Sequence, residues 1–366
     1  MRVLTINAGS SSVRLGVYRR DGDDWSPLAS VRHEGSNGDD APLRAILAEA
    51  EVAAPDVIVH RIVHGGDKLT GSRVIDAEVE QEIERLAALA PLHNPVALQW
   101  VRRARTAFGG ETPQVAVFDT AFYARLPAVA ATYPLPAELS RRLGIRRFGF
   151  HGLAHQSMWR QWRRGRDGRD EGRAISLQLG AGCSITAIED GIPRDTSMGY
   201  TPLEGLMMAT RSGDVDPGVI SHLQRTGAMT VEVVEEVLTQ QSGLLGVSGE
   251  SADLRVLLTS SRSEAHLAVD MFCYRARKYV GAYLAALGEV DAILIGGGAG
   301  EHLPEIRWRI LAALEPLGVK LDPEANRAAV GEAARISTPT SPIEVRVIMV
   351  DEAVIMVEEA VNCVKR

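Results

Sequence analysis

Two segments of the chain combine apolar, strand-like runs with short turns of glycine and small polar residues. Residues 3–18 carry such a turn at Gly9, and residues 175–188 carry a weaker echo of it at Gly180 and Gly182. These turns leave backbone N–H groups unobstructed and add hydroxyl or thiol groups, which together can hold a phosphate oxygen. The repeat suggests a duplicated phosphate clamp. The alternative is a pair of ordinary hairpins, because Gly-Ser turns are common.

Two arginines stand beside glycines, where a long cation has little local reason to be. Arg61 is in a run that ends at Gly65 and Gly66, and Arg211 precedes Gly213. Two guanidinium groups that converge from different domains would neutralise and orient a phosphate or a carboxylate through forked hydrogen bonds. An ordinary ion pair is the alternative for each arginine.

A third glycine-rich run, at residues 294–301, follows an apolar strand and precedes a helix expected from Pro304, so its backbone could approach a nucleotide closely. It lacks the full G-x-G-x-x-G spacing and lies late in the chain, which argues against a dinucleotide-binding fold. The chain has no G-x-x-x-x-G-K-[ST] element, so a Walker-type ATPase is not indicated. His151 and His155 have the helical spacing of a zinc pair, but the glutamate of a zincin motif is absent, and metal ligation by this pair is not predicted.

Length and composition indicate a globular protein with more than one core. The chain has 366 residues, 45% of them hydrophobic and 24% charged, so two domains with a cleft between them are expected. The formal net charge of −7 argues against a nucleic-acid partner. Three widely separated cysteines, no charged leader and no membrane-length apolar run predict a cytoplasmic protein with no membrane partner.

Apolar strands alternate with amphipathic helices, which predicts an α/β architecture. Strands are expected at residues 56–63, 115–118, 292–295 and 345–350, and helices at residues 76–90, 94–109, 231–240, 264–287 and from 352. Asp76 is a typical helix cap, and Pro95 and Gly109 suit the start and the end of a helix. Residues 25–53, by contrast, are polar, and only a short helical patch is predicted there.

Seven motifs of the chain, in their order and spacing, resemble the acetate kinase family over nearly the whole length. They are Asn7-Ala-Gly-Ser-Ser-Ser12, His60-Arg-Ile-Val-His-Gly-Gly66, Ala90-Pro-Leu-His-Asn-Pro95, Val117-Phe-Asp-Thr-Ala-Phe122, Arg147-Phe-Gly-Phe-His-Gly152, residues 195–206 and Thr210-Arg-Ser-Gly-Asp-Val-Asp-Pro217. The resemblance implies a duplicated actin-like (ribonuclease H-like) α/β fold, with two domains around a central cleft. It also implies a homodimer that uses ATP and Mg²⁺ to phosphorylate acetate or propionate to the acyl phosphate.

The resemblance further implies roles for individual residues and a division into domains. The catalytic and phosphate-binding group would be Asn7, Arg61, His93, Asp119, His151, Arg211 and Glu352, and the substrate pocket would be formed by Val63, Leu92 and Pro202 beside Arg61. The nucleotide-binding residues would be Asn7, Ser10, Ser12, Arg14, Gly180, Gly182, Asp253, Leu254, Arg255, Gly298, Ala299, Gly300 and Glu301, the last four of them in a loop. Asn7 and Glu352 would serve the metal, with Asp119 nearby. The N-terminal domain would comprise residues 1–121 and 353–366, and the C-terminal nucleotide-binding domain residues 122–352.

The chemistry of the implied reaction agrees with this equipment. A carboxylate substrate is ionised at neutral pH, with a pKa of roughly 4 to 5, and so needs no base to become a nucleophile. Asp119 is therefore interpreted as an orienting residue or a metal partner. The reaction instead requires relief of repulsion between an anion and a polyphosphate, and then stabilisation of a loose phosphoryl group held in line.

The second hairpin departs from the family's usual His-Leu-Gly-Asn-Gly, because it reads Gln178-Leu-Gly-Ala-Gly182. Gln178 can still donate a hydrogen bond, but Ala181 cannot, so contacts to the transferred phosphoryl group would be fewer. Three hypotheses follow: an acetate or propionate kinase that uses ATP, a kinase that uses another donor such as pyrophosphate or another short carboxylate, and a catalytically weak nucleotide-binding paralogue. The presence together of Arg61, His151, Arg211 and Glu352 argues against the third.

Overall fold

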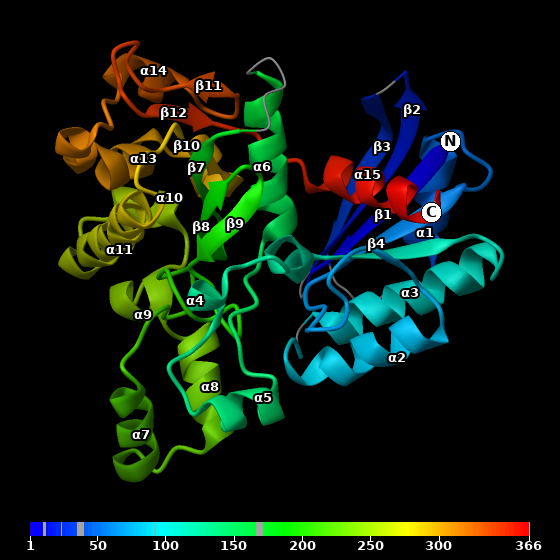
Figure 1. Cartoon of the computed structure of the whole chain (residues 1–366), viewed down its shortest axis with the longest axis horizontal. Helices are drawn as coiled ribbons and strands as arrows, with labels where there is room; N and C mark the ends of the chain where they lie inside the picture. Colours follow the sequence, from blue (N-terminus) through cyan, green and yellow to red (C-terminus); the bar gives the residue numbers. More distant parts are fainter. Residues whose placement is uncertain (10–11, 23, 35–39, 92, 166–170, 366) are drawn as a thin grey trace. The chain divides into compact units, whose positions relative to one another are not determined.

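The chain folds into two compact units (Figure 1). The computed structural model describes residues 1–9, 12–22, 24–34, 40–91, 93–165 and 171–365. Unit 1 consists of Met1–Ala124, Phe150–Ser157 and Asp351–Arg366, and unit 2 of Arg125–Gly149 and Met158–Val350. The domain boundaries expected from the family resemblance, after residues 121 and 352, stay a prediction.

Unit 1 is built on a mixed β-sheet, six-stranded in the part of the chain that the structure describes. Its strands are β1 (Arg2–Ala8), β2 (Ser12–Asp21), β3 (Asp24–Glu34), β4 (Val57–Ile62), β5 (Arg73–Val74) and β6 (Gln114–Phe118). They lie in the order β3-β2-β1-β4-β6-β5. β1, β4 and β6 are parallel, whereas β2, β3 and β5 each pair antiparallel with a neighbour.

Unit 2 contains a second mixed sheet, also of six strands in the described residues. Its strands are β7 (Arg173–Leu179), β8 (Cys183–Glu189), β9 (Ile192–Thr196), β10 (Ala292–Gly296), β11 (Ala334–Arg335) and β12 (Glu344–Val347). They lie in the order β11-β12-β10-β7-β8-β9. β7, β10 and β12 are parallel, and the other three pair antiparallel.

The two sheets have the same topology. In each, three antiparallel strands (β3-β2-β1 or β9-β8-β7) continue into two parallel strands (β4-β6 or β10-β12), and a two-residue strand closes the far edge antiparallel. The glycine-containing hairpins β1-β2 and β7-β8 therefore occupy equivalent places. This equivalence confirms the predicted duplicated α/β fold.

Helices cover both faces of the unit 1 sheet. They are α1 (Ala41–Glu49), α2 (Ala77–Arg85), α3 (Asn94–Phe108) and α15 (Glu352–Val364), with 3₁₀ turns η1 (Leu86–Ala88) and η2 (Asp119–Tyr123), and α6 (Gly152–Arg164) starts in this unit. Leu4 and Ile6 of β1 belong to a buried cluster with Trp100 of α3, whereas Val3 belongs to the cluster that contains Met356 of α15. Successive strand residues point to opposite faces, so alternate apolar residues bury both faces of the sheet.

Unit 2 holds most of the helices. They are α4 (Ala128–Ala131), α5 (Ala137–Leu143), α7 (Pro217–Thr226), α8 (Val231–Gln240), α9 (Gly243–Ser248), α10 (Leu254–Thr259), α11 (Ser263–Leu287), α12 (Gly297–His302), α13 (Pro304–Leu311), η3 (Ala312–Leu317) and α14 (Pro323–Ala328). The long helix α11 contacts β7 and β8. No helix of the described chain has the length and apolar character needed to cross a membrane.

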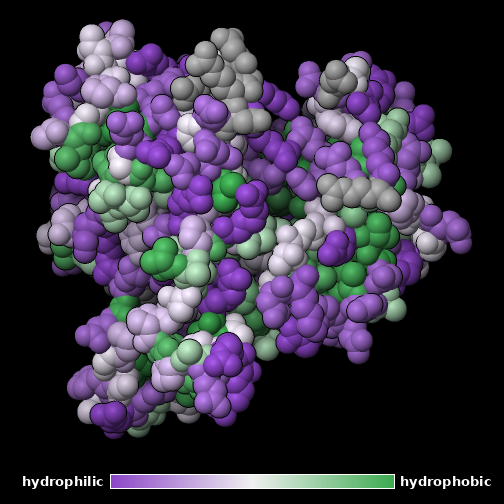
Figure 2. All heavy atoms as spheres, in the orientation of Figure 1, coloured by the Kyte–Doolittle hydropathy of each residue, from purple (hydrophilic) through white to green (hydrophobic). Residues whose placement is uncertain are grey.

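Local sequence signals set most helix boundaries as predicted. Asp76 caps α2, since its Oδ1 accepts from Val79 N at 2.8 Å. α3 starts at Asn94 and ends before Gly109, whose φ of 82° is in the region that favours glycine. On the face shown in Figure 2, hydrophilic residues predominate and hydrophobic ones form small groups, as expected when these amphipathic helices turn their apolar sides inward.

Three sequence predictions of local structure are wrong. Residues 24–34, predicted as part of a polar connection, form β3, an edge strand that tolerates Pro27 because one side of an edge strand needs no partner. The predicted strand at 345–350 ends at Val347, and the amide of Val350 instead donates to Glu301 Oε1. The glycine-rich run after β10 is the short helix α12, not a loop.

His60 of β4 is a buried neutral side chain, 1% exposed. Its Nε2 lies 2.7 Å from the side-chain amide of Gln114. Burial lowers the pKa of His60 to about 4, although the hydrogen bond with Gln114 acts to raise it.

Acid is expected to destabilise the fold through His60. The unfolded chain takes up a proton at the ordinary pKa of 6.5, whereas the folded ring stays neutral down to about 4, so the unfolded state binds more protons below pH 6.5. This group alone should lower the free energy of unfolding by about 3 kcal/mol as the pH falls from 6.5 to 4. Urea unfolding across this range should show a smaller loss in His60→Gln than in the wild type. His222→Gln, at an exposed position on α7, is the control, and a His60→Gln profile parallel to the wild type would contradict the assignment.

Candidate active site

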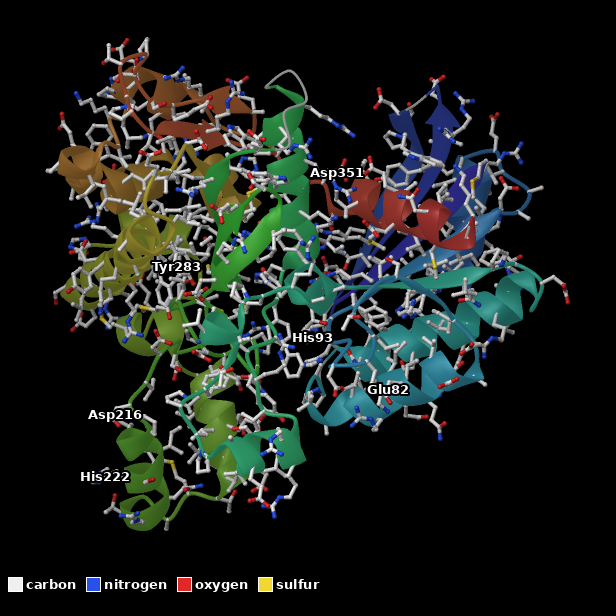
Figure 3. All side chains as sticks on the ribbon, in the orientation of Figure 1. Glu82, His93, Asp216, His222, Tyr283 and Asp351 are labelled. Atoms are coloured by element: carbon white, nitrogen blue, oxygen red, sulfur yellow. The ribbon has the colours of Figure 1, made fainter. Side chains whose placement is uncertain are left out.

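The candidate catalytic residues of unit 1 gather at one edge of its sheet. Asn7 is near the carboxyl end of β1, Arg61 is near that of β4, and Asp119 directly follows β6. Because these three strands are parallel, their carboxyl ends meet at the same edge, which is where open α/β sheets usually bind ligands. Glu352 opens α15 beside Asp351, which caps the helix through Val354 N and is labelled in Figure 3.

These side chains form one hydrogen-bonded chain. Arg61 donates to both carboxylate oxygens of Asp119, with Nε 3.0 Å from Oδ1 and Nη2 2.5 Å from Oδ2. Arg61 Nη1 also donates to Asn7 Oδ1 at 3.1 Å, and Asn7 Nδ2 donates to Glu352 Oε2 at 2.8 Å. The chain runs from one carboxylate through a guanidinium and an amide to a second carboxylate.

The carboxylates at this edge of the sheet stabilise the charged form of Arg61. Burial acts to lower the pKa of Arg61, but Asp119 and Glu352 outweigh it and raise the pKa above its ordinary value. Asp119 is 1% exposed, so its carboxylate is committed to Arg61. This geometry agrees with the interpretation of Asp119 as an orienting residue.

His151 lies next to this network through its backbone. A Cβ on the following Gly152 would lie 2.0 Å from Asp119 O, so the start of α6 packs directly on Asp119. His151 itself has a φ of 56°, in the left-handed region that costs a non-glycine residue free energy and is often found at functional sites.

Hydrogen bonds between His64 and Asn94 hold together the segments that contain Val63 and His93. His93 (Figure 3) precedes α3, and its neighbour Asn94 is fully buried. The Asn94 amide accepts from His64 N at 3.2 Å and donates to His64 O at 3.0 Å, which fixes the segment after β4 to the start of α3. Val63, 7% exposed, is in this fixed segment. Leu92, the other predicted pocket-forming residue of unit 1, lies outside the described residues, as does Ser10.

Arg211 of unit 2 is a partly buried cation in a different situation from Arg61. Its Nη1 donates to Pro202 O at 3.2 Å and lies 3.9 Å from Met208 Sδ. Throughout the described ranges, no carboxylate lies within ion-pair distance of it. Burial accordingly lowers the pKa of Arg211 below its ordinary value. This guanidinium is available to an anionic ligand, whereas that of Arg61 is already paired.

The turn of the second hairpin lies beside the segment that carries Arg211. Gly180 N donates to Gly182 O at 3.2 Å within the turn, and Ala181 O accepts from Ala209 N at 3.1 Å. The structure therefore brings two sequence-predicted features of unit 2 together. The equivalent turn of unit 1 has a bond from Gly9 N to Ser12 O at 2.8 Å.

The glycine-rich start of α12 packs on the end of β7. Gly297 has a φ of 78°, and a Cβ there would lie 2.7 Å from both Leu179 O and Gln178 Nε2. Glu301 Oε1 accepts from Gly297 N at 2.9 Å and from Val350 N, so this carboxylate oxygen secures the fold of the segment. Gln178 Oε1 is a buried acceptor without a partner among the described residues.

Gly298 has no packing reason to be glycine. A Cβ built there meets no described atom within 4 Å beyond its chain neighbours, and its φ is not in the left-handed region. Gly300, in contrast, is held by Ile295, 2.9 Å from its Cβ position. The missing side chain at Gly298 therefore leaves open space beside α12.

The remaining predicted nucleotide residues are spread over other elements. Asp253 caps α10 through the amide of Arg255, and its carboxylate also pairs with the exposed Arg255 guanidinium at 2.6 Å. Leu254 is buried behind this pair. Ser12 and Arg14 are on β2. Arg14 is the register partner of Asn7 on β1. The roles of Ser12, Arg14, Asp253, Leu254 and Arg255 in nucleotide binding stay predictions.

Sequence reasoning missed Arg307, a fully buried arginine of α13. Its Nη1 donates to Gly300 O at 2.7 Å and its Nε to Asn326 Oδ1 at 2.9 Å. Within the described residues it has no carboxylate partner, and burial lowers its pKa to about 10. It fixes the carboxyl end of α12 to α14. An arginine inside an amphipathic helix carries no sequence signal for this role.

The repeated sheet order, with a glycine-containing hairpin in each half, defines a duplicated actin-like fold. The Acetokinase family matches residues 41–358. The acetate kinase of Solibacter usitatus is 41% identical, over 100% of this chain and 98% of that protein. The chain is similar to the acetate kinase structure from Porphyromonas gingivalis (TM-score 0.89, 34% identity) and to a propionate kinase structure from Francisella tularensis (TM-score 0.88, 32% identity), with 99% of each chain covered in both cases. This chain belongs to the Acetokinase family, as its motifs predicted.

A side chain at Gly298 is expected to weaken nucleotide binding without destabilising the protein. In Gly298→Leu the added group would fill the open space over α12, and overpacking against a ligand costs about 1 to 3 kcal/mol, or roughly fivefold to a hundredfold in Kd. Calorimetric titration with ATP measures the effect, and thermal unfolding reports stability. Gly281→Leu, at an equally open position on α11, is the matched control. Unchanged ATP affinity in Gly298→Leu would contradict the assignment of this segment.

Proposed function

We propose that this protein transfers the γ-phosphoryl group of ATP directly, in line, to the carboxylate of acetate or propionate, and catalyses the reverse reaction. The observation that carries the proposal is the contrast between its two arginines. Arg61 is fixed by Asp119 and Asn7 at the strand ends, and Arg211 is partly buried without a carboxylate partner among the described residues. One cation is oriented in advance, and the other is left for an anion.

The substrate carboxylate needs no activation by a base, because it is ionised at neutral pH. Asp119, bound through both oxygens to Arg61, orients that guanidinium and does not act as a base. Arg61 then binds and orients the carboxylate, and His151 and His93 supply further donors. The barrier that remains is the repulsion between two anions, which these groups reduce.

Arg211 stabilises the phosphoryl group in transfer. A desolvated guanidinium without a counter-ion gains most from an anion that accumulates charge on its equatorial oxygens, as the loose transition state does. In the neighbouring turn the Gly180 N–H is bonded to Gly182 O, and the Gly182 N–H would donate to the same polyphosphate. We propose that Arg61 of unit 1 and Arg211 of unit 2 act in the same reaction.

The residues at the strand ends fit a magnesium ion that is held mainly by phosphate and water. The described chain contains no cluster of three or more potential ligands, but Mg²⁺ usually takes only one or two carboxylates from a protein. Glu352 is half-buried, and its Oε2 is oriented by Asn7. Glu352 and Asn7 would hold the ion through water, and the bound ion would neutralise charge on the transferring phosphates.

The substrate pocket is small in this proposal. Val63, Leu92 and Pro202 would surround the methyl or ethyl group of the acid. One methylene in an apolar pocket changes discrimination by only about 1 to 3 kcal/mol, so acetate and propionate can both serve. Asp253, Arg255 and Gly298 would contact the adenosine of ATP. We also propose a homodimer, as the family resemblance implies, and a cytoplasmic location, as the cysteine usage indicates.

A screen of donors and acids tests the function. Acyl phosphate is trapped as hydroxamate, with ATP or pyrophosphate as donor and with acids of two to four carbons. Turnover with ATP and acetate or propionate is expected. Turnover with pyrophosphate alone would support the second candidate function, which the loss of a side-chain donor at Ala181 favours. Nucleotide binding without any turnover would support a non-catalytic paralogue.

Arg211→Ala is expected to lower kcat by more than about a hundredfold, because a donor to the developing charge is lost. The fold should be intact, since no ion pair of the described protein depends on Arg211. Arg211→Lys should restore only part of the rate, because an ammonium cannot form the forked contact. Steady-state kinetics with the hydroxamate assay measures the effect, and Arg262→Ala at an exposed position is the control. A turnover number unchanged in Arg211→Ala would refute the role.

Glu352→Gln is expected to raise the Mg²⁺ concentration needed for half-maximal rate by about tenfold or more, because it removes the charge while keeping an acceptor for Asn7. Titration of activity with MgCl₂ at saturating ATP measures the shift. Glu324→Gln, on the exposed surface of α14, should leave the titration unchanged. An identical Mg²⁺ dependence in Glu352→Gln and wild type would remove Glu352 from the metal site.

A further inference from the structure

A hydrogen-bonded cluster in unit 2 lies outside the residues assigned so far. The Glu204 carboxylate accepts from Arg147 Nη2 at 2.6 Å through Oε1 and from the Tyr133 hydroxyl through Oε2. The Arg147 guanidinium also donates to Ser197 O at 3.3 Å and lies 5.5 Å from the centre of the Tyr133 ring. All three side chains are partly buried, and the carboxylate is satisfied by a cation and a hydroxyl.

The Tyr133 hydroxyl closes a small loop of backbone. It donates to Glu204 Oε2 and accepts from Tyr200 N at 2.9 Å. Both ends of residues 200–204 are therefore tied to one oxygen atom. Burial, and then Glu204, raise the pKa of Tyr133, so its proton stays in place to donate.

Close contacts on both sides of the loop fix where it begins and where it ends. A Cβ at Gly199 would lie 1.6 Å from Glu204 Oε2 and 2.0 Å from the Tyr133 hydroxyl, so only glycine fits before the loop. Gly205, directly after it, has a φ of 104°, and its amide donates to Asp214 Oδ1 at 2.8 Å. Both flanks of residues 200–204 are thus fixed by close contacts.

The middle residue of this loop is Pro202, whose carbonyl accepts the hydrogen bond from Arg211 Nη1 at 3.2 Å. This is the one oxygen acceptor of the Arg211 guanidinium in the described structure. The position of that carbonyl therefore decides where the guanidinium points. The ring of Pro202 is, in the proposed function, also a wall of the substrate pocket.

We propose that Tyr133 is a positioning residue for the phosphoryl transfer: its hydroxyl closes the loop of residues 200–204 and so places the Pro202 carbonyl that orients Arg211. The inference rests on the proposed function for its kinetic consequence. Its structural part, the closure of the loop by one hydroxyl, is independent of the reaction catalysed. Glu204 and Arg147 act through the same closure.

Tyr133→Phe is the sharpest test, because it removes only the hydroxyl oxygen and keeps the ring under the Arg147 guanidinium. We expect kcat with acetate to fall by about tenfold to a hundredfold, since a displacement of about 1 Å in a catalytic group can cost that much. The ratio of kcat/KM for acetate to that for propionate should change by about threefold or more, because Pro202 moves. KM for ATP should stay within about twofold, because no adenosine residue is touched.

Tyr274→Phe on the exposed face of α11 is the matched control and should behave as wild type. Hydrogen exchange of the Tyr200 amide, which needs no turnover, gives a second measurement: exchange should be at least about tenfold faster in Tyr133→Phe than in either reference. Three results would each overturn the inference. They are wild-type kinetics in Tyr133→Phe, an unchanged exchange rate of the Tyr200 amide, and an equal loss of kcat/KM for both acids together with a raised KM for ATP. If the wild type itself phosphorylates neither acid, the proposed function fails, and the exchange measurement still decides whether the hydroxyl closes the loop.

Discussion

The ion pair between Arg61 and Asp119 is the interaction on which the rest of unit 1's candidate site depends. Two charges at the end of a buried sheet lose their hydration, and only a bidentate contact of this quality compensates for the loss. Removing one partner would leave the other charged and buried, at a cost of about 3 to 5 kcal/mol. The pair therefore fixes the remaining nitrogen of Arg61, and through it Asn7 and Glu352. The backbone of Asp119 in turn fixes the start of α6, where His151 adopts a left-handed conformation.

Arg211 shows the opposite use of the same side chain. The fold holds it by one carbonyl and a thioether, and no carboxylate offsets its desolvation among the residues described. A burial that lowers an arginine pKa is unfavourable for the free protein, and such a cost is expected where a ligand supplies the missing charge. The two arginines therefore have different electrostatic roles. The paired guanidinium of Arg61 has a fixed geometry, whereas the guanidinium of Arg211, without a described carboxylate partner, stabilises an anion most where negative charge develops.

The sequence predicted the secondary structure well wherever the determining signal lies within a few residues of the element. Caps such as Asp76 and the left-handed Gly109 set helix boundaries, and strand periodicity gave the parallel strands whose ends carry Asn7 and Arg61. It failed where the determinant is a long-range contact. The strand β3 exists because β2 offers it an edge, although its own residues are polar and include a proline. The link from Tyr133 to Tyr200 and Glu204 joins residues 67 and 71 positions apart, and nothing in the local pattern of a tyrosine before a proline indicates it.

The duplicated topology makes positions in the two sheets equivalent, and the residues at these equivalent positions differ between the two units. Asn7 and Gln178 each stand two residues before the glycine of their hairpin turn, on strands with the same neighbours. The strand beside Asn7 carries Arg61, whereas Gly296 is the register partner of Gln178 on the strand beside it. The strand ends of unit 1 thus carry charged side chains. In unit 2 Gly297 lies close to Gln178, and a Cβ at Gly298 would have no neighbour within 4 Å among the described residues beyond its own helix. In the proposed function the first environment serves the small anionic acceptor and the second serves the nucleotide, so the same sheet order can carry both roles with different residues at a few strand-end positions.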